Sequence, residues 1–243
     1  LPPGIGYRKP AAAGRRHGRC PALLRIISPT PTLMTRTTVS IQEPRIYLAS
    51  NSPRRRDLLN QIHVRFDPLL FRDRSRHDTD IDESARSGED AFAYVRRVAL
   101  AKAAGGIQRV SWRGLLPQPV LAADTTLELD GEIIGKPDSP AHAAAILREL
   151  SGRTHQVLTA VALADGDHTL ERLSVSQVRF RRLEEEEIRR YVATGEPMDK
   201  AGAYGIQGRA AVFIEEIRGS YTGIVGLPLF ETADLLREFG FAL

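Results

Sequence analysis

Hydrophobic and polar positions follow two periods from residue 45 onward, one typical of strands and one of helices. The short apolar run Arg45–Ser50 indicates a buried strand, whereas Pro53–Ile62 carries its leucines and isoleucine at helical spacing. Pro53 fits this helix because proline is tolerated in a first helical turn. The longest helix is predicted over Glu89–Ile107, where apolar side chains recur on one face.

The remaining predicted elements continue this alternation. Strands are predicted at Val64–Leu70, Pro119–Leu129, Gln156–Ala164, Glu171–Phe180 and Val212–Ile217. Helices are predicted at Pro140–Leu150, Glu184–Ala193 and Pro228–Phe239. Asp130-Gly131 is typical of a hairpin turn, so the strand before it is expected to begin a strand pair. The pattern predicts an α/β fold, a mixed β-sheet flanked by helices.

The first 43 residues have a different composition. Residues 1–33 contain six basic side chains, no acidic one and many prolines, glycines and alanines, which predicts a disordered basic extension over 1–43. The folded domain is expected over 44–243. Met34 is the first methionine, so a true start there is one hypothesis, and an organelle transit peptide is the alternative.

Composition limits the classes of protein that this chain can be. The only cysteine is Cys20, which excludes an intrachain disulfide framework, a zinc ribbon and an iron–sulfur cluster. We find no apolar run of roughly 18 residues that could span a membrane, and we expect a cytoplasmic protein without a membrane partner. The whole chain has a net charge of +4, but residues 1–33 alone carry +6, so the rest of the chain has a net charge of −2. Its basic residues are also not interleaved with aromatic residues, so a nucleic-acid partner is not expected.

Lysine is rare in this chain, which has 30 arginines and four lysines. Beyond the first 43 residues the lysines are Lys102, Lys136 and Lys200. A lysine kept where arginine is the default suggests a point charge with a defined position. The alternative explanation is that these few lysines stand at their positions by chance.

Two motifs combine polar residues in ways that suit a phosphate ligand. Ser50–Arg56 (SNSPRRR) lies where a strand gives way to a helix, and free N–H groups with hydroxyls and a guanidinium there can bind an anion. The alternative is an ordinary helix cap at Ser52. Asp124 follows an apolar strand, where a carboxylate can hold Mg²⁺ or orient water, or can simply close an Asx turn.

Two further segments add candidate ligands. Asp80–Glu83 (DIDE) precedes the long helix and can supply a carboxylate to a metal, or can be a solvated loop. The histidines show no metal-like spacing, which favours a hard cation over zinc. Asp199–Gly208 (DKAGAYGIQG) surrounds one glutamine with glycines, so its backbone can approach a flat ligand, and a mobile loop is the alternative.

Together these motifs resemble the Maf family of nucleoside triphosphate pyrophosphatases. They occur in family order between Arg45 and about Phe239. They are LASNSPRR (48–55), DIDE (80–83), VALAKA (98–103), AADT (122–125), GKP (135–137), LSGRTHQVLTAVAL (150–163), DKAGAYGIQG (199–208), GSY (219–221) and VGLPL (225–229). The resemblance implies hydrolysis of a nucleoside triphosphate between its α and β phosphates with Mg²⁺ or Mn²⁺, a fold similar to that of the inosine triphosphate pyrophosphatases, and a homodimer.

The resemblance also implies roles for individual residues. Asp124 is the proton acceptor, Glu83 and Lys136 are catalytic, and Asp124 and Glu83 hold the metal. Ser52, Arg54, Arg55 and Lys102 bind the phosphates. Arg54, Thr125 and Gln207 select the base, in a pattern similar to the branch of the family that acts on dTTP and UTP. An aspartate in water has a pKa near ~3.9, so the role of base rests on the resemblance alone.

Three alternative functions remain at this point. The branch acting on 7-methyl-GTP shares the phosphate motifs, and a phosphatase releasing orthophosphate would use similar groups. A nucleotide-binding regulator of septum formation is the non-catalytic alternative. Carboxylates beside a polyanion favour an enzyme, since they repel the ligand unless a cation intervenes.

Overall fold

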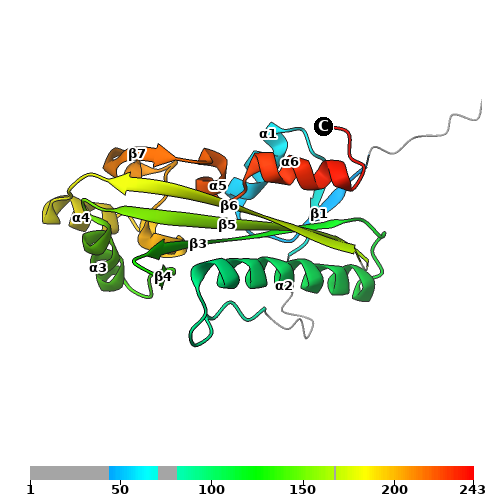
Figure 1. Ribbon diagram of the computed structural model, residues 1–243, viewed down its shortest axis with the longest axis horizontal. Coiled ribbons are helices and arrows are strands. Elements are labelled where there is room, and N and C mark those ends of the chain that lie inside the picture. The colour runs from blue at the N-terminus through cyan, green and yellow to red at the C-terminus, as the bar shows by residue number, and fades with distance from the viewer. Residues whose placement is uncertain (1–43, 71–80, 167) are drawn as a thin grey trace, which may run out of the picture. The chain divides into compact units, whose positions relative to one another are not determined.

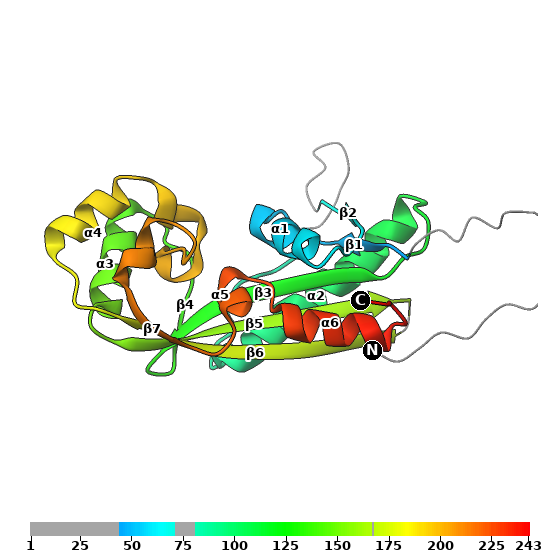
Figure 2. The same ribbon diagram turned by 90° about the horizontal axis from the view of Figure 1, so that it is seen from above.

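A computed structural model describes residues 44–70, 81–166 and 168–243 of the chain. In this part the strands form one seven-stranded sheet in the order β2-β1-β3-β5-β6-β7, with β4 paired to β3 (Figures 1 and 2). The strands are β1 (Ile46–Leu48), β2 (Phe66–Pro68), β3 (Val120–Leu129), β4 (Glu132–Ile134), β5 (Thr154–Asp165), β6 (His168–Phe180) and β7 (Ile214–Arg218). The predicted mixed sheet is therefore confirmed.

The sheet changes from parallel to antiparallel pairing at β3. Strand β1 runs parallel to both β2 and β3, whereas β3, β5, β6 and β7 are antiparallel neighbours. The turn Asp130-Gly131 joins β3 to β4, as the hairpin dipeptide predicted. Side chains of β3 and β5 are buried on both faces, which explains why both strands read as nearly continuous apolar runs.

Helices cover both faces of the sheet. They are α1 (Pro53–Gln61), α2 (Ala91–Trp112), α3 (Pro140–Leu150), α4 (Glu185–Val192), α5 (Tyr221–Val225) and α6 (Leu229–Glu238). Helix α2 lies on one face, and α1, α5 and α6 lie on the other (Figure 1). Helices α3 and α4 gather at one end with three short 3₁₀ helices, η1 (Glu196–Asp199), η2 (Ala201–Ala203) and η3 (Arg209–Phe213) (Figure 2).

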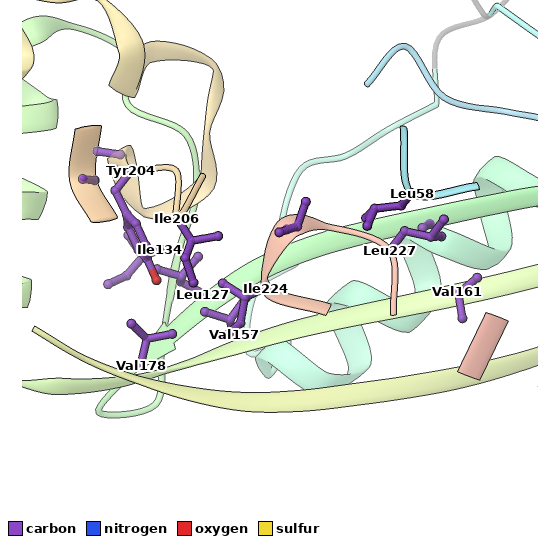
Figure 3. Packing of buried hydrophobic residues seen from close by; sticks show 14 of the residues in the cluster. Leu58, Leu127, Ile134, Val157, Val161, Val178, Tyr204, Ile206, Ile224 and Leu227 are labelled. Atoms are coloured by element: carbon purple, nitrogen blue, oxygen red, sulfur yellow. The ribbon is translucent and has the colours of Figure 1, made fainter. Parts of the chain in front are cut away.

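The two faces of the sheet have different cores. On the side of α1, α5 and α6, leucines, isoleucines and aromatic residues form a large cluster that continues to the α3 end (Figure 3). On the α2 side the sheet presents mainly alanines, including Ala122 and Ala160. Small side chains let α2 approach the sheet closely. A Cβ on Gly106 would lie only 2.5 Å from Val120 Cγ1.

Several predicted boundaries were wrong by a few residues. Helix α2 continues past Ile107 to Trp112, and Arg109 and Val110 in this last part are still buried. It begins after Asp90, whose carboxylate accepts a hydrogen bond from the Ala93 N–H at 2.8 Å and caps the helix. The predicted strand at Val212 starts only at Ile214, since the residues before it form η3. The predicted disordered extension over residues 1–43 lies outside the described residues.

Candidate active site

One cavity of about 1180 Å³ opens between the β1–α1 turn, α2, β3 and the loops around η1, η2 and α5. All nine residues predicted to carry chemistry line it. They are Ser52, Arg54, Arg55, Glu83, Lys102, Asp124, Thr125, Lys136 and Gln207. Lys200 lines it as well, so the three lysines beyond residue 43 converge on one site. A cavity of this size accommodates a ligand as large as a nucleotide.

A lysine joins two carboxylates at the α2 side of the cavity. Lys102 Nζ lies 2.8 Å from Asp124 Oδ1 and 3.0 Å from Glu83 Oε1. The side chains of Lys102 and Asp124 are nearly buried, with 13% and 10% of their surface exposed, whereas Glu83 is 46% exposed. The close approach of α2 to β3 over the alanine face brings Lys102 to the aspartate. We call Lys102, Asp124 and Glu83 the carboxylate–lysine centre.

The turn between β1 and α1 forms the second wall. Ser52 precedes α1 and accepts no capping hydrogen bond from that helix within the described residues, although its N–H donates to Ser50 Oγ at 3.2 Å. Helix α1 thus begins at the cavity wall without this side-chain cap on its first-turn N–H groups, which suits an anion. Arg54 lies in the same turn, with Nη1 3.8 Å from Asp199 Oδ2 across the cavity.

Arg55 ties three segments together beneath this turn. Its Nε donates to the Gly226 carbonyl at 2.7 Å, Nη1 to Ser50 Oγ at 3.2 Å and Nη2 to Thr125 Oγ1 at 3.3 Å. Burial is the main cause that lowers the pKa of Arg55, and Asp124 opposes it. A guanidinium has five N–H donors, so three protein contacts leave two for a phosphate. Arg55 thus braces the site in addition to its predicted role.

Thr125 belongs to a buried chain of polar contacts. Its Oγ1 lies 3.0 Å from Thr159 Oγ1 on the neighbouring strand β5, and Thr159 Oγ1 donates to the Gly223 carbonyl at 2.8 Å. Together with the contact from Arg55, this chain fixes the Thr125 side chain. The residue is therefore held rigidly at the cavity wall next to Asp124.

Gln207 lies in a loop that the core anchors from both sides. Tyr204 and Ile206 are buried among apolar residues of β3, β4 and β5 (Figure 3). Glu196 supports the same loop from beneath, accepting hydrogen bonds from Tyr191 Oη at 3.0 Å and the Arg209 N–H at 3.1 Å. These contacts connect the loop to the core and to Glu196 at the cavity wall.

The model of one protein family, described as "Maf-like protein", matches residues 45–239. The chain belongs to the Maf family. Its relatives include three proteins named dTTP/UTP pyrophosphatase. That of Aromatoleum aromaticum is 65% identical over 83% of this chain and 98% of its own length. That of Dechloromonas aromatica is 59% identical over 81% of this chain and 98% of its own length. That of Chromobacterium violaceum is 53% identical over 84% of this chain and 100% of its own length.

Among solved structures, the Staphylococcus aureus Ham1 protein overlays on this Maf chain with a TM-score of 0.42 and 18% sequence identity. The overlay covers 80% of this chain and 97% of that one. In the described part of the chain, no helix is long and apolar enough to cross a membrane.

The donor set of this Maf site suits a hard divalent cation. Asp124 and Glu83 direct two carboxylates to the same part of the cavity, where both contact Lys102 Nζ. The described residues contain no cluster of three or more metal-ligating side chains. Mg²⁺ commonly uses only one or two carboxylates and completes its shell with water and substrate phosphates, so two carboxylates fit it.

Two neighbours of Glu83 in the predicted acidic cluster have other roles or no described position. Asp82 accepts hydrogen bonds from the N–H and hydroxyl of Ser84, which lower the pKa of Asp82, and it does not line the cavity. Asp80 lies outside the described residues. Among the described residues of this cluster, Glu83 is the carboxylate that lines the cavity.

Sequence reasoning missed two cavity residues. Glu196 stands in a Gly-Glu-Pro turn with no periodic signal, and only its contacts across the loop reveal it. Tyr94 stands on the i, i+4, i+8 row of α2 that ends in Lys102, a spacing that could have indicated it. Burial and the nearby Asp124 and Glu83 carboxylates raise the pKa of Tyr94 to about 12.

Proposed function

We propose that this Maf chain hydrolyses dTTP and UTP between the α and β phosphates, releasing the nucleoside monophosphate and pyrophosphate. The observation that carries the proposal is the carboxylate–lysine centre beside the start of α1 in one cavity. Relatives that are 53–65% identical over nearly their whole length bear the name dTTP/UTP pyrophosphatase, which supports this substrate choice.

The reaction that we propose is a displacement by water at the α phosphorus. The water oxygen bonds to that phosphorus, and the bond from it to the oxygen bridging the β phosphate breaks. The bridging oxygen leaves with the pyrophosphate, and the proton of the attacking water passes to the Asp124 carboxylate. Asp124 Oδ1 is engaged by Lys102, so we assign the proton to its other carboxylate oxygen.

Positively charged side chains at the site would stabilise the transition state of this reaction. Negative charge spreads over the phosphoryl oxygens and the leaving pyrophosphate in the transition state. Lys102, Lys136 and Arg54 surround the cavity, and Ser52 adds a hydroxyl beside the helix start. We assign Ser52, Arg54, Arg55 and Lys102 to the phosphates and Lys136 to the developing charge.

We further propose that Asp124 and Glu83 would hold a Mg²⁺ or Mn²⁺ ion together with the triphosphate. When bound, such an ion neutralises phosphate charge and makes bound water more acidic. Lys102 contacts both carboxylates and keeps them together when no substrate is present.

Base selection is assigned to Arg54, Thr125 and Gln207. A glutamine can donate and accept hydrogen bonds at once, which matches the edge of a pyrimidine ring. Gln207 is placed by an anchored loop and Thr125 by a buried polar chain, so both can discriminate by fixed geometry.

We propose a cytoplasmic homodimer whose catalytic domain is residues 44–243, with residues 1–43 outside it. The family match to residues 45–239 supports this domain boundary.

The test is product analysis across a panel of nucleotides. Purified protein with Mg²⁺ or Mn²⁺ receives dTTP, UTP, CTP, GTP, ATP or 7-methyl-GTP, and pyrophosphate and orthophosphate are measured separately. We expect pyrophosphate from dTTP and UTP and a loss of at least about 100-fold in kcat for Asp124→Asn, since it removes a general base. Preference for 7-methyl-GTP would assign the chain to the other branch, and binding without turnover would favour the regulator.

A further inference from the structure

The segment that carries Glu83 is irregular and mostly exposed. Residues 81–90 belong to no strand, and Glu83 itself is 46% exposed. A carboxylate on such a segment needs some means of staying at one position. Its side-chain contact with Lys102 is one such means, but it leaves the backbone unexplained.

Helix α2 holds this backbone through three successive carbonyl oxygens. The carbonyl of Glu83 accepts a hydrogen bond from Tyr94 Oη at 2.9 Å. The carbonyls on either side, of Asp82 and Ser84, accept from Arg97 Nη1 at 3.4 Å and Nη2 at 2.9 Å. Two side chains one turn apart on α2 thus hold three consecutive peptide groups.

Arg97 is itself fixed at the other end of the segment. Its Nε and Nη2 donate to the two carboxylate oxygens of Glu89 at 2.6 and 2.7 Å, a bidentate pair. The pair is shielded, with 18% of the Arg97 side chain and 9% of the Glu89 side chain exposed. The Arg97 guanidinium also lies 5.6 Å from the centre of the Tyr94 ring. The hydrogen bonds from Arg97 lower the pKa of Glu89 to about 2, so Glu89 is ionised at neutral pH.

We propose that Tyr94, Arg97 and Glu89 form a clasp that positions Glu83 for the reaction. The inference rests on the proposed function, which gives Glu83 its catalytic role. The clasp residues act through Glu83 and are positioning residues. Because α2 also carries Lys102, one helix fixes both the backbone of Glu83 and the partner of its side chain.

The test is a double-mutant cycle with Arg97→Gln and Glu83→Gln in the full chain. A misplacement of about 1 Å can cost up to about 100-fold in rate, so we expect Arg97→Gln to lower kcat by about 10- to 100-fold. In a protein that already carries Glu83→Gln, Arg97→Gln should lower kcat by less than about twofold, because its effect passes through Glu83. Tyr94→Phe removes one hydrogen bond and should lower kcat by roughly 3- to 10-fold.

Arg96→Gln is the matched control. Arg96 is the neighbouring arginine on α2 and pairs instead with Glu171 at 3.4 Å. This variant should retain wild-type kcat, which separates the clasp from a general loss of charge on the helix. Equal losses in the Arg96 and Arg97 variants would overturn the proposal, and so would losses from Arg97→Gln and Glu83→Gln that multiply in the double mutant.

Hydrogen exchange gives a readout that needs no activity. We expect the Ser84 amide, whose N–H donates to Asp82 Oδ1 at 2.9 Å, to exchange at least about tenfold faster in Arg97→Gln than in the wild type or Arg96→Gln, because the segment loses its fixed backbone. Unchanged exchange in Arg97→Gln would overturn the clasp. A folded wild type that turns over no nucleotide would instead overturn the proposed function, so the two failures are distinguishable.

Discussion

At the residue scale, the scarcity of lysine was the most informative feature of the sequence. Lys102, Lys136 and Lys200 are far apart along the chain, yet all three line one cavity. A chain that uses arginine for most of its surface charge keeps lysine where a compact point charge has a defined contact, as Lys102 has with two carboxylates.

Gly208 provides a prediction at this scale. A Cβ on Gly208 would lie 2.0 Å from Glu196 Oε1, so Gly208→Ala must displace Glu196 or the loop that carries Gln207. We expect KM for dTTP to rise about 10-fold or more, since loss of one or two substrate contacts costs that much. Steady-state kinetics with dTTP and UTP measure it.

Gly135→Ala is the matched control for this change. Gly135 is in another cavity loop, and a Cβ there would meet nothing within 4 Å. It should change KM by less than about twofold. Equal effects of the two alanines would show that Glu196 does not fix the loop.

The sequence predicted which residues line the cavity better than it predicted what holds them. Asp124 and Lys102 were identifiable from local motifs. Glu196, Tyr94 and the bracing contacts of Arg55 were not, because each depends on partners that are distant along the chain or lie on another loop. Periodicity reports which face of an element is buried and carries no information on such pairs.

At the element scale, strands and helices with strong periodicity were predicted closely, and short irregular elements were missed. Helix α3 begins and ends as predicted, with Pro140 in its first turn and the Ser139 side chain accepting from the His142 N–H. Helices η1, η2 and α5 each span only three to five residues, too few for a period to show. Gly202, with φ of +70°, breaks η2 where Leu127 packs against it.

The adjacent glycines of α2 give the prediction at this scale. Gly106→Ala would place a Cβ 2.5 Å from Val120 Cγ1 in the core, and overpacking of this kind costs about 1–3 kcal/mol. Alanine favours a helix by up to about 1 kcal/mol over glycine, so we expect a net destabilisation of about 1–2 kcal/mol. The free energy of unfolding in urea measures the change.

Gly105→Ala is the paired control. Its Cβ would lie 3.0 Å from the ends of the Arg109 and Ile81 side chains, which can move aside. The change should be neutral or should stabilise the protein by up to about 1 kcal/mol. If both alanines stabilise the protein, α2 does not lie against β3 as closely as described.

At the scale of the whole molecule, stability depends on the buried His155. The ring packs edge-on against Phe180 and Tyr204, Nε2 lies 2.7 Å from Tyr204 Oη, and burial lowers the pKa of His155 to about 4. The unfolded chain binds this proton near pH 6.5 and the folded chain only near pH 4. His155 therefore lowers the stability as the pH falls from about 6.5 to 4.

This titration sets the expected size and pH range of the effect. A difference of about 2.5 pH units corresponds to roughly 3 kcal/mol, and His155→Gln should flatten the curve of unfolding free energy in that window. Hydrogen bonds from arginines hold the pKa values of Glu89 and Glu187 at about 2. The contribution of these two carboxylates to the stability of the fold is therefore lost only below about pH 4.5. The free energy of unfolding in urea, measured at pH 4.5, 5.5 and 7 for the wild type and His155→Gln, checks this. An equal change of that free energy with pH in both proteins would contradict the prediction.

The most direct test of the central claim is hydrolysis of dTTP and UTP in water enriched in oxygen-18, with the products separated and weighed by mass spectrometry. Attack of water on the α phosphorus places the heavy oxygen in the nucleoside monophosphate and leaves the released pyrophosphate unlabelled. We expect that result for the wild type and a rate at least about 100-fold lower for Asp124→Asn. Heavy oxygen in the pyrophosphate would contradict attack at the α phosphorus, and release of orthophosphate in its place would contradict cleavage between the α and β phosphates.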